Sequence, residues 1–476
     1  MQIINKKRAY FQTGIMHLQQ GNFEQAYKYF KELAEMGDAH AQSNLGVMYL
    51  SGQGVPLDLE KAAYWFEKSA KQGVEMAQYN LGNIYLDENY AQHNIQKAIE
   101  WFEKAAKKGF VSAQVQLGII YRTKVIDLNK AMFWLKKAAE QNEPYALFLI
   151  GTIHAYGRGV PQDYAAAKPW YEKSAQLGFV GGEYNLGCLY YDGNGVEQNF
   201  QQALHWLSKA ANQNDDDAQY LIGEMYENGR GVAQDYAQAR KYYEQAAQQN
   251  NIKAQFALGE LYAEGKGVRK RYTDARIWYE QAAQQGHMVA QILLAELYQQ
   301  GKGGAKDLEK AFKWYEQAAH RGDSYAQYWV GYAYYHGEGV KQNDKQAFFW
   351  IKQSAQQGDM DAQSLLGDMY VWGRGCKPSH KQAFLWYKKA AEQGDADSLY
   401  QLAEIYYQDT RDREERWSAV VKRDLVKAQN YMAQAAALGH RYAKTDLPKI
   451  EKALAAARAW EVEFKKFEKK LKELEK

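Results

Sequence analysis

The strongest constraint on the fold of this chain is a regular internal period. A Gly or Ala that follows Leu, Ile or Val recurs along the sequence, and nine of the ten spacings between successive members are 36 residues. The exception, from Gly118 to Gly151, is 33 residues. Such a period is typical of an array of small units that each bury their apolar face against a neighbour. We number these units repeats 1 to 11 after their small residue: Gly46, Gly82, Gly118, Gly151, Gly187, Gly223, Gly259, Ala295, Gly331, Gly367 and Ala403.

Each unit reads as a helix, a glycine turn and a second helix. In repeat 6 the apolar residues around Gly223 fall on one helical stripe. Gly229 is expected to end that helix, and Asp235 is placed to cap the next one. Small residues at Gly223 and Ala239 let the two helices approach closely. A column of aromatic residues in the second helix is predicted to fill the space between units: Trp65, Trp101, Trp134, Trp170, Trp206, Tyr242, Trp278, Trp314, Trp350 and Trp386.

The pattern AQYxLGxxYxxGxGVxxDxxxAxxWYxxAAxxG, which residues 218–250 and 254–286 follow closely, resembles the Sel1-like repeat family, a relative of the tetratricopeptide repeat. The resemblance covers roughly residues 39–439. It implies an all-α protein, a right-handed α/α superhelical solenoid of about eleven repeats. Residues 1–38 are expected to form a tetratricopeptide-like hairpin, and residues 440–476 a half-repeat followed by an amphipathic capping helix.

Composition and charge exclude several functional classes. The net charge is +3, with 60 Lys and Arg against 57 Asp and Glu, so neither a nucleic acid nor an acidic membrane is expected as a partner. No apolar run reaches the ~18 residues of a membrane span. If Met1 is native the protein is expected to be cytoplasmic, whereas a periplasmic or secreted location follows if Met1 replaces a removed signal peptide. Cys188 and Cys376 are predicted to be isolated thiols.

Motifs that suggest chemistry are better explained by the repeat. The Gly-x-Gly turns follow helices and recur, whereas a phosphate-binding loop follows a strand at one place in a protein. His336 has no second ligand at metal-binding spacing, and no nucleophile elbow or His-Glu-x-x-His motif is present. We therefore expect no enzyme activity, no cofactor and no metal.

The residues that the fold does not need point to a protein partner. On the face that related repeats turn toward their concave surface, repeats 6 to 11 are acidic, while repeats 1 to 5 are mostly neutral or apolar with Arg122 among the exceptions. Two interpretations are open, a functional acidic groove and a merely solvated face. The candidate partner-binding residues are Asp217, Glu224, Glu227, Glu260, Glu264, Glu296, Tyr332, Tyr335, His336, Asp361, Asp368, Trp372, Asp397 and Glu404.

The leading functional hypothesis is a scaffold that holds a protein or peptide with a basic surface in this groove. Tyr332, Tyr335, His336 and Trp372 would supply aromatic anchors. The alternative, suggested by the resemblance, is an immunity-type inhibitor that neutralises one toxin or regulatory protein.

The last helix carries an apolar row at alternating spacings of three and four, from Ile450 to Leu474. One interpretation is a cap over repeat 11. The other is a contact with a second copy of the chain or with a partner through residues 460–476. The spacing favours a cap over 446–464 and an overhang beyond it, and the charged insertion at 409–417 is predicted to be a protruding loop.

Overall fold

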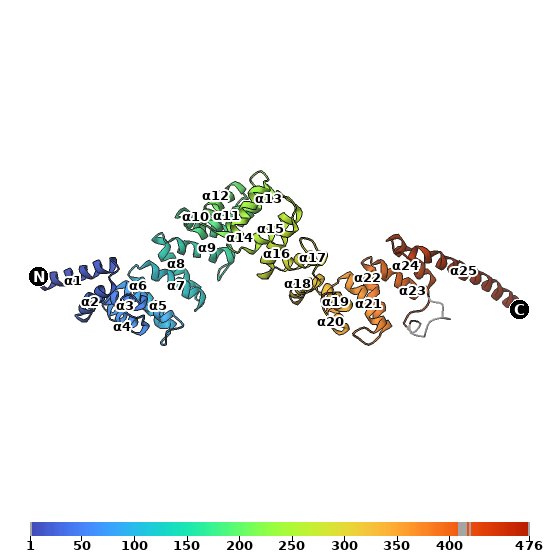
Figure 1. The fold of residues 1–476 in the computed structure, drawn as a ribbon, viewed down its shortest axis with the longest axis horizontal. Helices are drawn as coiled ribbons and strands as arrows, with labels where there is room; N and C mark the ends of the chain where they lie inside the picture. The colour runs from blue at the N-terminus through green and yellow to red at the C-terminus, as the bar shows by residue number, and fades with distance from the viewer. Residues whose placement is uncertain (1, 408–416, 418–419, 475–476) are drawn as a thin grey trace. The chain divides into compact units, whose positions relative to one another are not determined.

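The computed structural model describes residues 2–407, 417 and 420–474. These residues form 25 helices and contain no strand, which confirms the all-α prediction (Figure 1). The chain divides into two compact units, Met1–Asp235 and Tyr236–Lys476, and each is described by itself.

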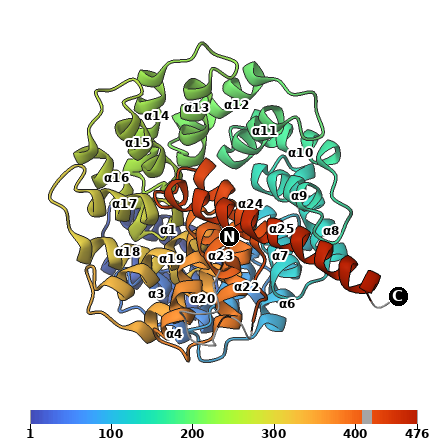
Figure 2. The same cartoon turned by 90° about the vertical axis from the view of Figure 1, so that its right-hand side faces the viewer.

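In unit 1 each helix packs on the next along the chain, so the unit is a stack of helical hairpins. Figure 2 shows α9 and α11 on the inner side of the curve and α8, α10 and α12 on the outer side. The helices of unit 1 are α1 (Gln2–Gln19), α2 (Phe23–Glu35), α3 (Ala39–Ser51), α4 (Leu59–Lys71), α5 (Glu75–Leu86), α6 (Ile95–Lys107), α7 (Val111–Thr123), α8 (Leu128–Glu140), α9 (Pro144–Tyr156), α10 (Tyr164–Gln176), α11 (Val180–Asp192), α12 (Phe200–Asn212) and α13 (Asp216–Asn228).

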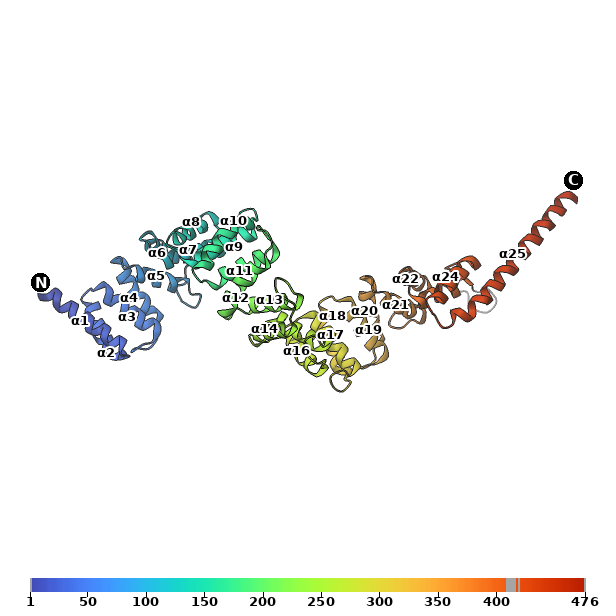
Figure 3. The same ribbon diagram turned by 90° about the horizontal axis from the view of Figure 1, so that it is seen from above.

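Unit 2 continues the same hairpin stacking, with each helix packed on its successor (Figure 3). In this unit α15 and α17 lie on the inner side of the curve, and α14, α16 and α18 lie on the outer side (Figure 2). The helices of unit 2 are α14 (Tyr236–Gln248), α15 (Ile252–Glu264), α16 (Tyr272–Gln284), α17 (Met288–Gln300), α18 (Leu308–His320), α19 (Ser324–His336), α20 (Asp344–Gln356), α21 (Met360–Trp372), α22 (His380–Glu392), α23 (Ala396–Tyr407), α24 (Leu425–Ala437) and α25 (Ala443–Leu474).

Local chemistry sets the ends of these helices. Gly337, at φ 75°, ends α19 in the left-handed conformation that side chains disfavour. The side chain of Asn343 then accepts hydrogen bonds from the amides of Lys345 and Gln346 and so starts α20. Gly339, at φ 70°, lies so close to the carbonyl of Leu308 that an added Cβ would overlap it. The two glycines of the turn therefore have different tasks, ending a helix and contacting the preceding repeat.

The recurring small residue of the first helix packs on a buried side chain of the second helix. A Cβ on Gly46 would lie 2.7 Å from the ring of Phe66, and one on Gly367 would lie 2.5 Å from the ring of Tyr387. These side chains are the residues that follow the tryptophan column. Of the nine predicted core tryptophans, only Trp134 and Trp350 are buried, and the other seven are half-exposed.

Buried glutamines connect neighbouring repeats. Gln78 Nε2 donates to the carbonyl of Ala70 at 3.0 Å, and corresponding glutamines do the same in seven other repeats. In repeat 5 the position holds a carboxylate, Glu183, which is buried and accepts from Gln213 Nε2 at 2.7 Å. Burial raises the pKa of Glu183. This residue is thus a charged exception in a ladder of neutral amides.

The last helix covers the end of unit 2 over a shorter length than expected. Its buried residues are Ala443, Ile450 and Leu454, and residues 455–473 are all exposed. The prediction of a cap as far as residue 464 is wrong, because Trp460 is 68% exposed and α25 leaves the packed surface before it. The predicted loop at 409–417 lies outside the described residues except for Trp417.

Candidate functional site

The predicted partner-binding residues lie on odd-numbered helices, and Figure 2 shows α9 and α11 of unit 1 and α15 and α17 of unit 2 on the inner side. Three of them belong to α13 of unit 1, and the other eleven to α15, α17, α19, α21 and α23 of unit 2. Six side chains are exposed: Asp217, Glu264, His336, Asp361, Trp372 and Asp397. Eight are half-buried: Glu224, Glu227, Glu260, Glu296, Tyr332, Tyr335, Asp368 and Glu404.

Three of the carboxylates directly after the glycine position interact with buried tyrosines of the paired helix. The clearest case is Tyr387, whose hydroxyl donates to Asp368 Oδ1 at 2.6 Å. The charge of Glu260 contributes to the raised pKa of Tyr279, after the dominant effect of burial. Glu296 contributes in the same way to the raised pKa of Tyr315.

This pairing leaves a signal in the sequence that the pattern of exposed charges did not reveal. In four of the five repeats that have a tyrosine nineteen residues later, the residue after the glycine position is acidic, as in the pair Asp368 and Tyr387. The exception is repeat 4, where Thr152 precedes Tyr171. Where that later residue is Phe66 or Phe102, the residue after the glycine is Val47 or Asn83. The acidic residues directly after the glycine position, here called the acidic column, are therefore partly explained by the hydrogen bonds that buried tyrosines need.

Other members of the acidic set are also engaged by the chain itself. Glu224 Oε1 accepts from the Tyr191 hydroxyl at 2.9 Å and lies 3.2 Å from Arg230 Nη1. Glu296 Oε1 accepts from the hydroxyl of Tyr325 at 2.9 Å. The carboxylates of this face are thus oriented by neighbouring side chains.

Carboxylates from two helices converge on a pocket of about 480 Å³ near the end of unit 2. Burial raises the pKa of Asp368, and the hydrogen bond from Tyr387 opposes that rise. The pKa of Asp361, on the same helix, is raised by burial and by the charges of Asp395 and Asp397. The pocket is lined by Ser364, Asp368, Asp397, Tyr400, Gln401, His440 and Tyr442.

His440 is a pocket residue that was not among the predicted site residues. It lies between α24 and α25 at the N-cap position of the repeat, where its Nδ1 accepts from the amide of Ala443 at 3.2 Å, as His287 Nδ1 accepts from that of Ala290 at 3.1 Å. His440 Nε2 lies 3.3 Å from Asp397 Oδ1, and its ring stacks on that of Tyr400 at 4.3 Å. The hydroxyl of Tyr400 donates to Asp446 Oδ2 at 3.0 Å. The first turn of α25 therefore helps to fix one wall of the pocket.

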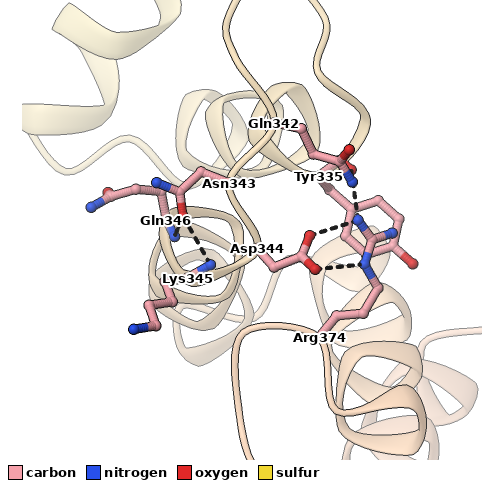
Figure 4. Close-up of polar contacts among 7 residues, drawn as sticks. All are labelled: Tyr335, Gln342, Asn343, Asp344, Lys345, Gln346 and Arg374. Carbon is pink, nitrogen blue, oxygen red and sulfur yellow. Dashed lines mark hydrogen bonds and ion pairs between the residues drawn. The ribbon is translucent and has the colours of Figure 1, made fainter.

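The predicted aromatic anchors lie on α19 and α21. The rings of Tyr332 and His336 are 4.2 Å apart, and Trp372 is 74% exposed at the end of α21. Tyr335 is engaged by the chain itself, because the guanidinium of Arg374 lies 3.5 Å from its ring centre (Figure 4). The exposed side chains His336 and Trp372 thus offer more surface to a partner than the half-buried Tyr332 and Tyr335 do.

The described residues contain no group of three or more His, Cys, Asp or Glu side chains arranged to hold a metal ion. Within the same residues, no helix combines the length and apolar character that a membrane crossing requires. Both cysteines are free thiols.

Comparison with known proteins identifies the repeat. The Sel1 repeat model matches twelve segments: 9–38, 39–74, 75–110, 111–143, 144–179, 181–215, 216–251, 252–287, 289–323, 324–359, 361–395 and 396–440. The chain belongs to the Sel1 repeat family. The first Sel1 segment, 9–38, is the hairpin that the sequence analysis described as tetratricopeptide-like.

Two solved Sel1 structures resemble this chain. One is c5321, a protective antigen present in uropathogenic Escherichia coli strains, with 35% identity over 92% of this chain and 93% of that chain, and a TM-score of 0.64. The other is a Sel1 repeat protein from Oxalobacter formigenes, with 30% identity over 65% of this chain and 92% of that chain, and a TM-score of 0.55. No match is found among the curated proteins. Sel1 repeat proteins generally mediate protein–protein interactions and are typically non-catalytic scaffolds.

Proposed function

We propose that this Sel1 repeat protein is a non-enzymatic scaffold that binds a protein or peptide on the inner face of unit 2. A basic side chain of the partner enters the pocket formed by Asp368, Asp397 and His440. The observation that carries this proposal is the convergence of carboxylates from α21 and α23 on a pocket of about 480 Å³.

The electrostatics of the pocket favour a cationic partner. Burial raises the pKa of Asp368, because the surrounding protein solvates its charged form less well than water does. A lysine or arginine side chain in the pocket would compensate that charge with charge-assisted hydrogen bonds. Asp397, which is exposed at the rim, would steer the approach of the same partner. The exposed ring of Trp372 adds a surface of the kind that dominates binding energy at interfaces.

The test uses a labelled twelve-residue peptide of four Arg-Gly-Leu units, with four Gln-Gly-Leu units as the neutral control, titrated by fluorescence anisotropy. Asp368→Asn keeps the shape of the side chain and is expected to weaken binding about 10-fold. Asp397→Asn, at an exposed position, is expected to weaken binding about 2- to 5-fold. The matched control is Glu309→Gln on the outer helix α18, where the carboxylate pairs with Lys313 at 2.6 Å.

Salt provides the second measurement. Exposed charges are screened over about 8–10 Å at 0.1–0.15 M salt, so the difference between wild type and Asp397→Asn should shrink as salt rises. Equal affinity of the wild-type protein for the arginine and glutamine peptides would refute the acidic pocket. So would identical binding by wild type and Asp368→Asn.

Affinity separates this scaffold from the alternative of an immunity-type inhibitor. An inhibitor should capture one dominant partner with a nanomolar Kd, about −12 kcal/mol, whereas a scaffold should bind several partners at micromolar Kd. The measurement is a pull-down with the full chain, followed by calorimetry on each purified partner.

The exposed end of α25 is proposed as a second contact surface, made with another copy of the same helix. Its exposed apolar side chains continue the alternating spacing of a coiled-coil seam beyond the packed part of the helix. Trp460 and Phe464 stack on each other with ring centres 5.1 Å apart. The exposed members of the row are Trp460, Phe464, Phe467 and Leu471.

A further inference from the structure

In two Gly-Arg-Gly turns the arginine contacts the tyrosine at the same position of the preceding repeat. In unit 1, Arg230 donates to the hydroxyl of Tyr191, which lies 39 residues earlier. In unit 2, Arg374 lies over the ring of Tyr335, also 39 residues earlier, and donates to its carbonyl oxygen at 2.9 Å (Figure 4). The arginine of the turn therefore reaches back to the residue four positions after the glycine of the preceding repeat.

In both turns a carboxylate of the chain compensates the arginine. Glu224 Oε1 lies 3.2 Å from Arg230 Nη1. Asp344 accepts two hydrogen bonds from Arg374, at 2.6 Å from Nη2 and 3.2 Å from Nε (Figure 4). The contact thus has three parts, an aromatic residue, an arginine and an acid.

The third Gly-Arg-Gly turn, at Gly157–Gly159 in unit 1, has no acid at either equivalent position. By repeat register, the residue that corresponds to Tyr191 and Tyr335 is Arg122, and the charge of Arg158 acts on it. The position of Glu224 is held by Thr152, and the position of Asp344 by Leu128, which contacts the turn at Gly159. This turn therefore has two arginines at the positions where the other turns have an arginine and a tyrosine, and it lacks their carboxylate.

The two cations are not compensated by the part of the chain that the structure describes. Arg122 is half-buried, and its Nε is enclosed without a hydrogen-bond partner. Burial, followed by the charge of Arg158, lowers the pKa of Arg122, and the one opposing effect comes from Tyr145 and not from a carboxylate. The guanidinium of Arg158 lies 5.9 Å from the ring of Tyr156, an aromatic contact that leaves its charge in place. Two adjacent guanidinium groups of this kind are a strong site for a carboxylate, which arginine binds in a bidentate manner.

Two aromatic side chains of α9 lie near the arginines: Tyr156 beside Arg158, and Tyr145 close enough to act electrostatically on Arg122. Tyr156, on the last turn of α9, is 60% exposed. At the start of the same helix Tyr145 stacks on Phe148 with ring centres 6.1 Å apart, and Phe179 packs 5.4 Å from Phe148. Apolar and aromatic rings beside the cations favour a protein segment with apolar residues next to its acid over a bare inorganic anion.

We propose that Arg122 and Arg158 form a binding site for a carboxylate of an acidic protein segment, on the inner side of unit 1. The partner's acid takes the place that Glu224 and Asp344 occupy in the other two turns. The inference shares the protein-binding function proposed above, but its site lies in unit 1 and takes the opposite charge. Failure of one site is therefore distinguishable from failure of the other.

The experiment uses the full chain and a labelled twelve-residue peptide of four Glu-Gly-Leu units, with the four Gln-Gly-Leu units as the neutral control. Wild type is expected to bind the glutamate peptide at least ~10-fold more tightly than the glutamine peptide. Arg122→Gln and Arg158→Gln are each expected to remove about 10-fold of that affinity. Arg158→Lys keeps the positive charge but loses the planar pair of guanidinium donors. Its affinity for the glutamate peptide is expected to lie between those of wild type and Arg158→Gln. The control is Arg374→Gln, which removes an arginine that is already paired with Asp344 and should leave glutamate-peptide binding unchanged.

Thermal unfolding supplies a second measurement. The variants Arg122→Gln and Arg158→Gln relieve repulsion between like charges, so their melting temperature without peptide should equal or exceed that of wild type. The glutamate peptide should raise the melting temperature of wild type and not that of the two variants. Equal binding of both peptides to wild type, unchanged binding by both variants, or stabilisation by inorganic phosphate but not by the glutamate peptide would each overturn the proposal.

Discussion

Replacing Tyr387 with phenylalanine tests whether buried tyrosines hold the acidic column of the inner face. Tyr387 is buried beneath Gly367, and its hydroxyl donates to Asp368 Oδ1 at 2.6 Å. The substitution removes one oxygen and keeps the ring. A hydrogen bond to a charged group contributes about 1.5–3 kcal/mol, so the free energy of local unfolding of α21 and α22 should fall by that amount.

The reciprocal change, Asp368→Val, leaves the hydroxyl of Tyr387 buried without its acceptor and should cost about 1–3 kcal/mol. The double variant, Asp368→Val with Tyr387→Phe, reproduces the Val47 and Phe66 pair that repeat 1 already contains. Its loss of stability should be smaller than the sum of the two single losses by about 1.5–3 kcal/mol, because no polar group is then left unpaired.

The effect of pH on this pair has a defined sign. Burial raises the pKa of Asp368 in the folded state, so its carboxyl favours folding below its unfolded pKa and loses that contribution as pH rises through the folded pKa. Tyr387→Phe removes the hydrogen bond that opposes the shift, so the pKa of Asp368 should rise further. The loss of stability in Tyr387→Phe should therefore be larger at pH 7 than at pH 4.

Amide hydrogen exchange of α21 and α22 is the suitable assay, because repeat arrays open locally and global unfolding averages over many repeats. Tyr171→Phe is the matched control, since the hydroxyl of Tyr171 is buried and has no hydrogen-bond partner among the described residues. That control should be neutral or slightly stabilising. The reasoning would be refuted if Tyr387→Phe and Tyr171→Phe lowered the free energy of local unfolding equally. It would also be refuted if the loss of stability in the double variant equalled the sum of the losses in Asp368→Val and Tyr387→Phe.

Two further predictions follow from single features of the two units. Glu183→Gln should stabilise unit 1 by about 0.5–2 kcal/mol at pH 7, because it restores the neutral amide of the buried ladder. Since burial raises the pKa of Glu183, the gain measured by urea denaturation should shrink as pH falls, and a loss of stability at pH 7 would contradict the prediction. Deletion of residues 455–476, which are exposed as far as 473, should leave the melting temperature unchanged and convert a dimer to a monomer in light scattering. The control is deletion of 443–476, which also removes the buried Ile450 and should lower the melting temperature. If the full-length chain and the 455–476 deletion are both monomers in light scattering, association through α25 is excluded.

The sequence by itself determined the repeat and its local structure. The 36-residue period, the glycine turns and the Asp or Asn caps are all signals carried by neighbouring residues, and they predicted the helix–turn–helix unit correctly. The close helix contact at Gly223-type positions was also predictable, because a small residue on an apolar stripe marks a place where two helices can touch. The residue that fills that contact was misassigned to the tryptophan column, since adjacent aromatic positions differ only in the angle at which the helix presents them.

Only the tertiary structure decided which charges are engaged by the chain and which are left for a partner. Glu224 and Asp368 looked alike as exposed acids, yet one lies beside an arginine 6 residues later and the other accepts from a tyrosine 19 residues later. The same holds for Arg122 and Arg158, whose electrostatic interaction depends on the stacking of two repeats. His440 joins the pocket because α24 ends beside α23, and only the burial of its side chains shows that α25 leaves the packed surface after Leu454. Local pattern fixes backbone geometry, whereas the pairing of side chains across repeats depends on distances that the pattern does not contain.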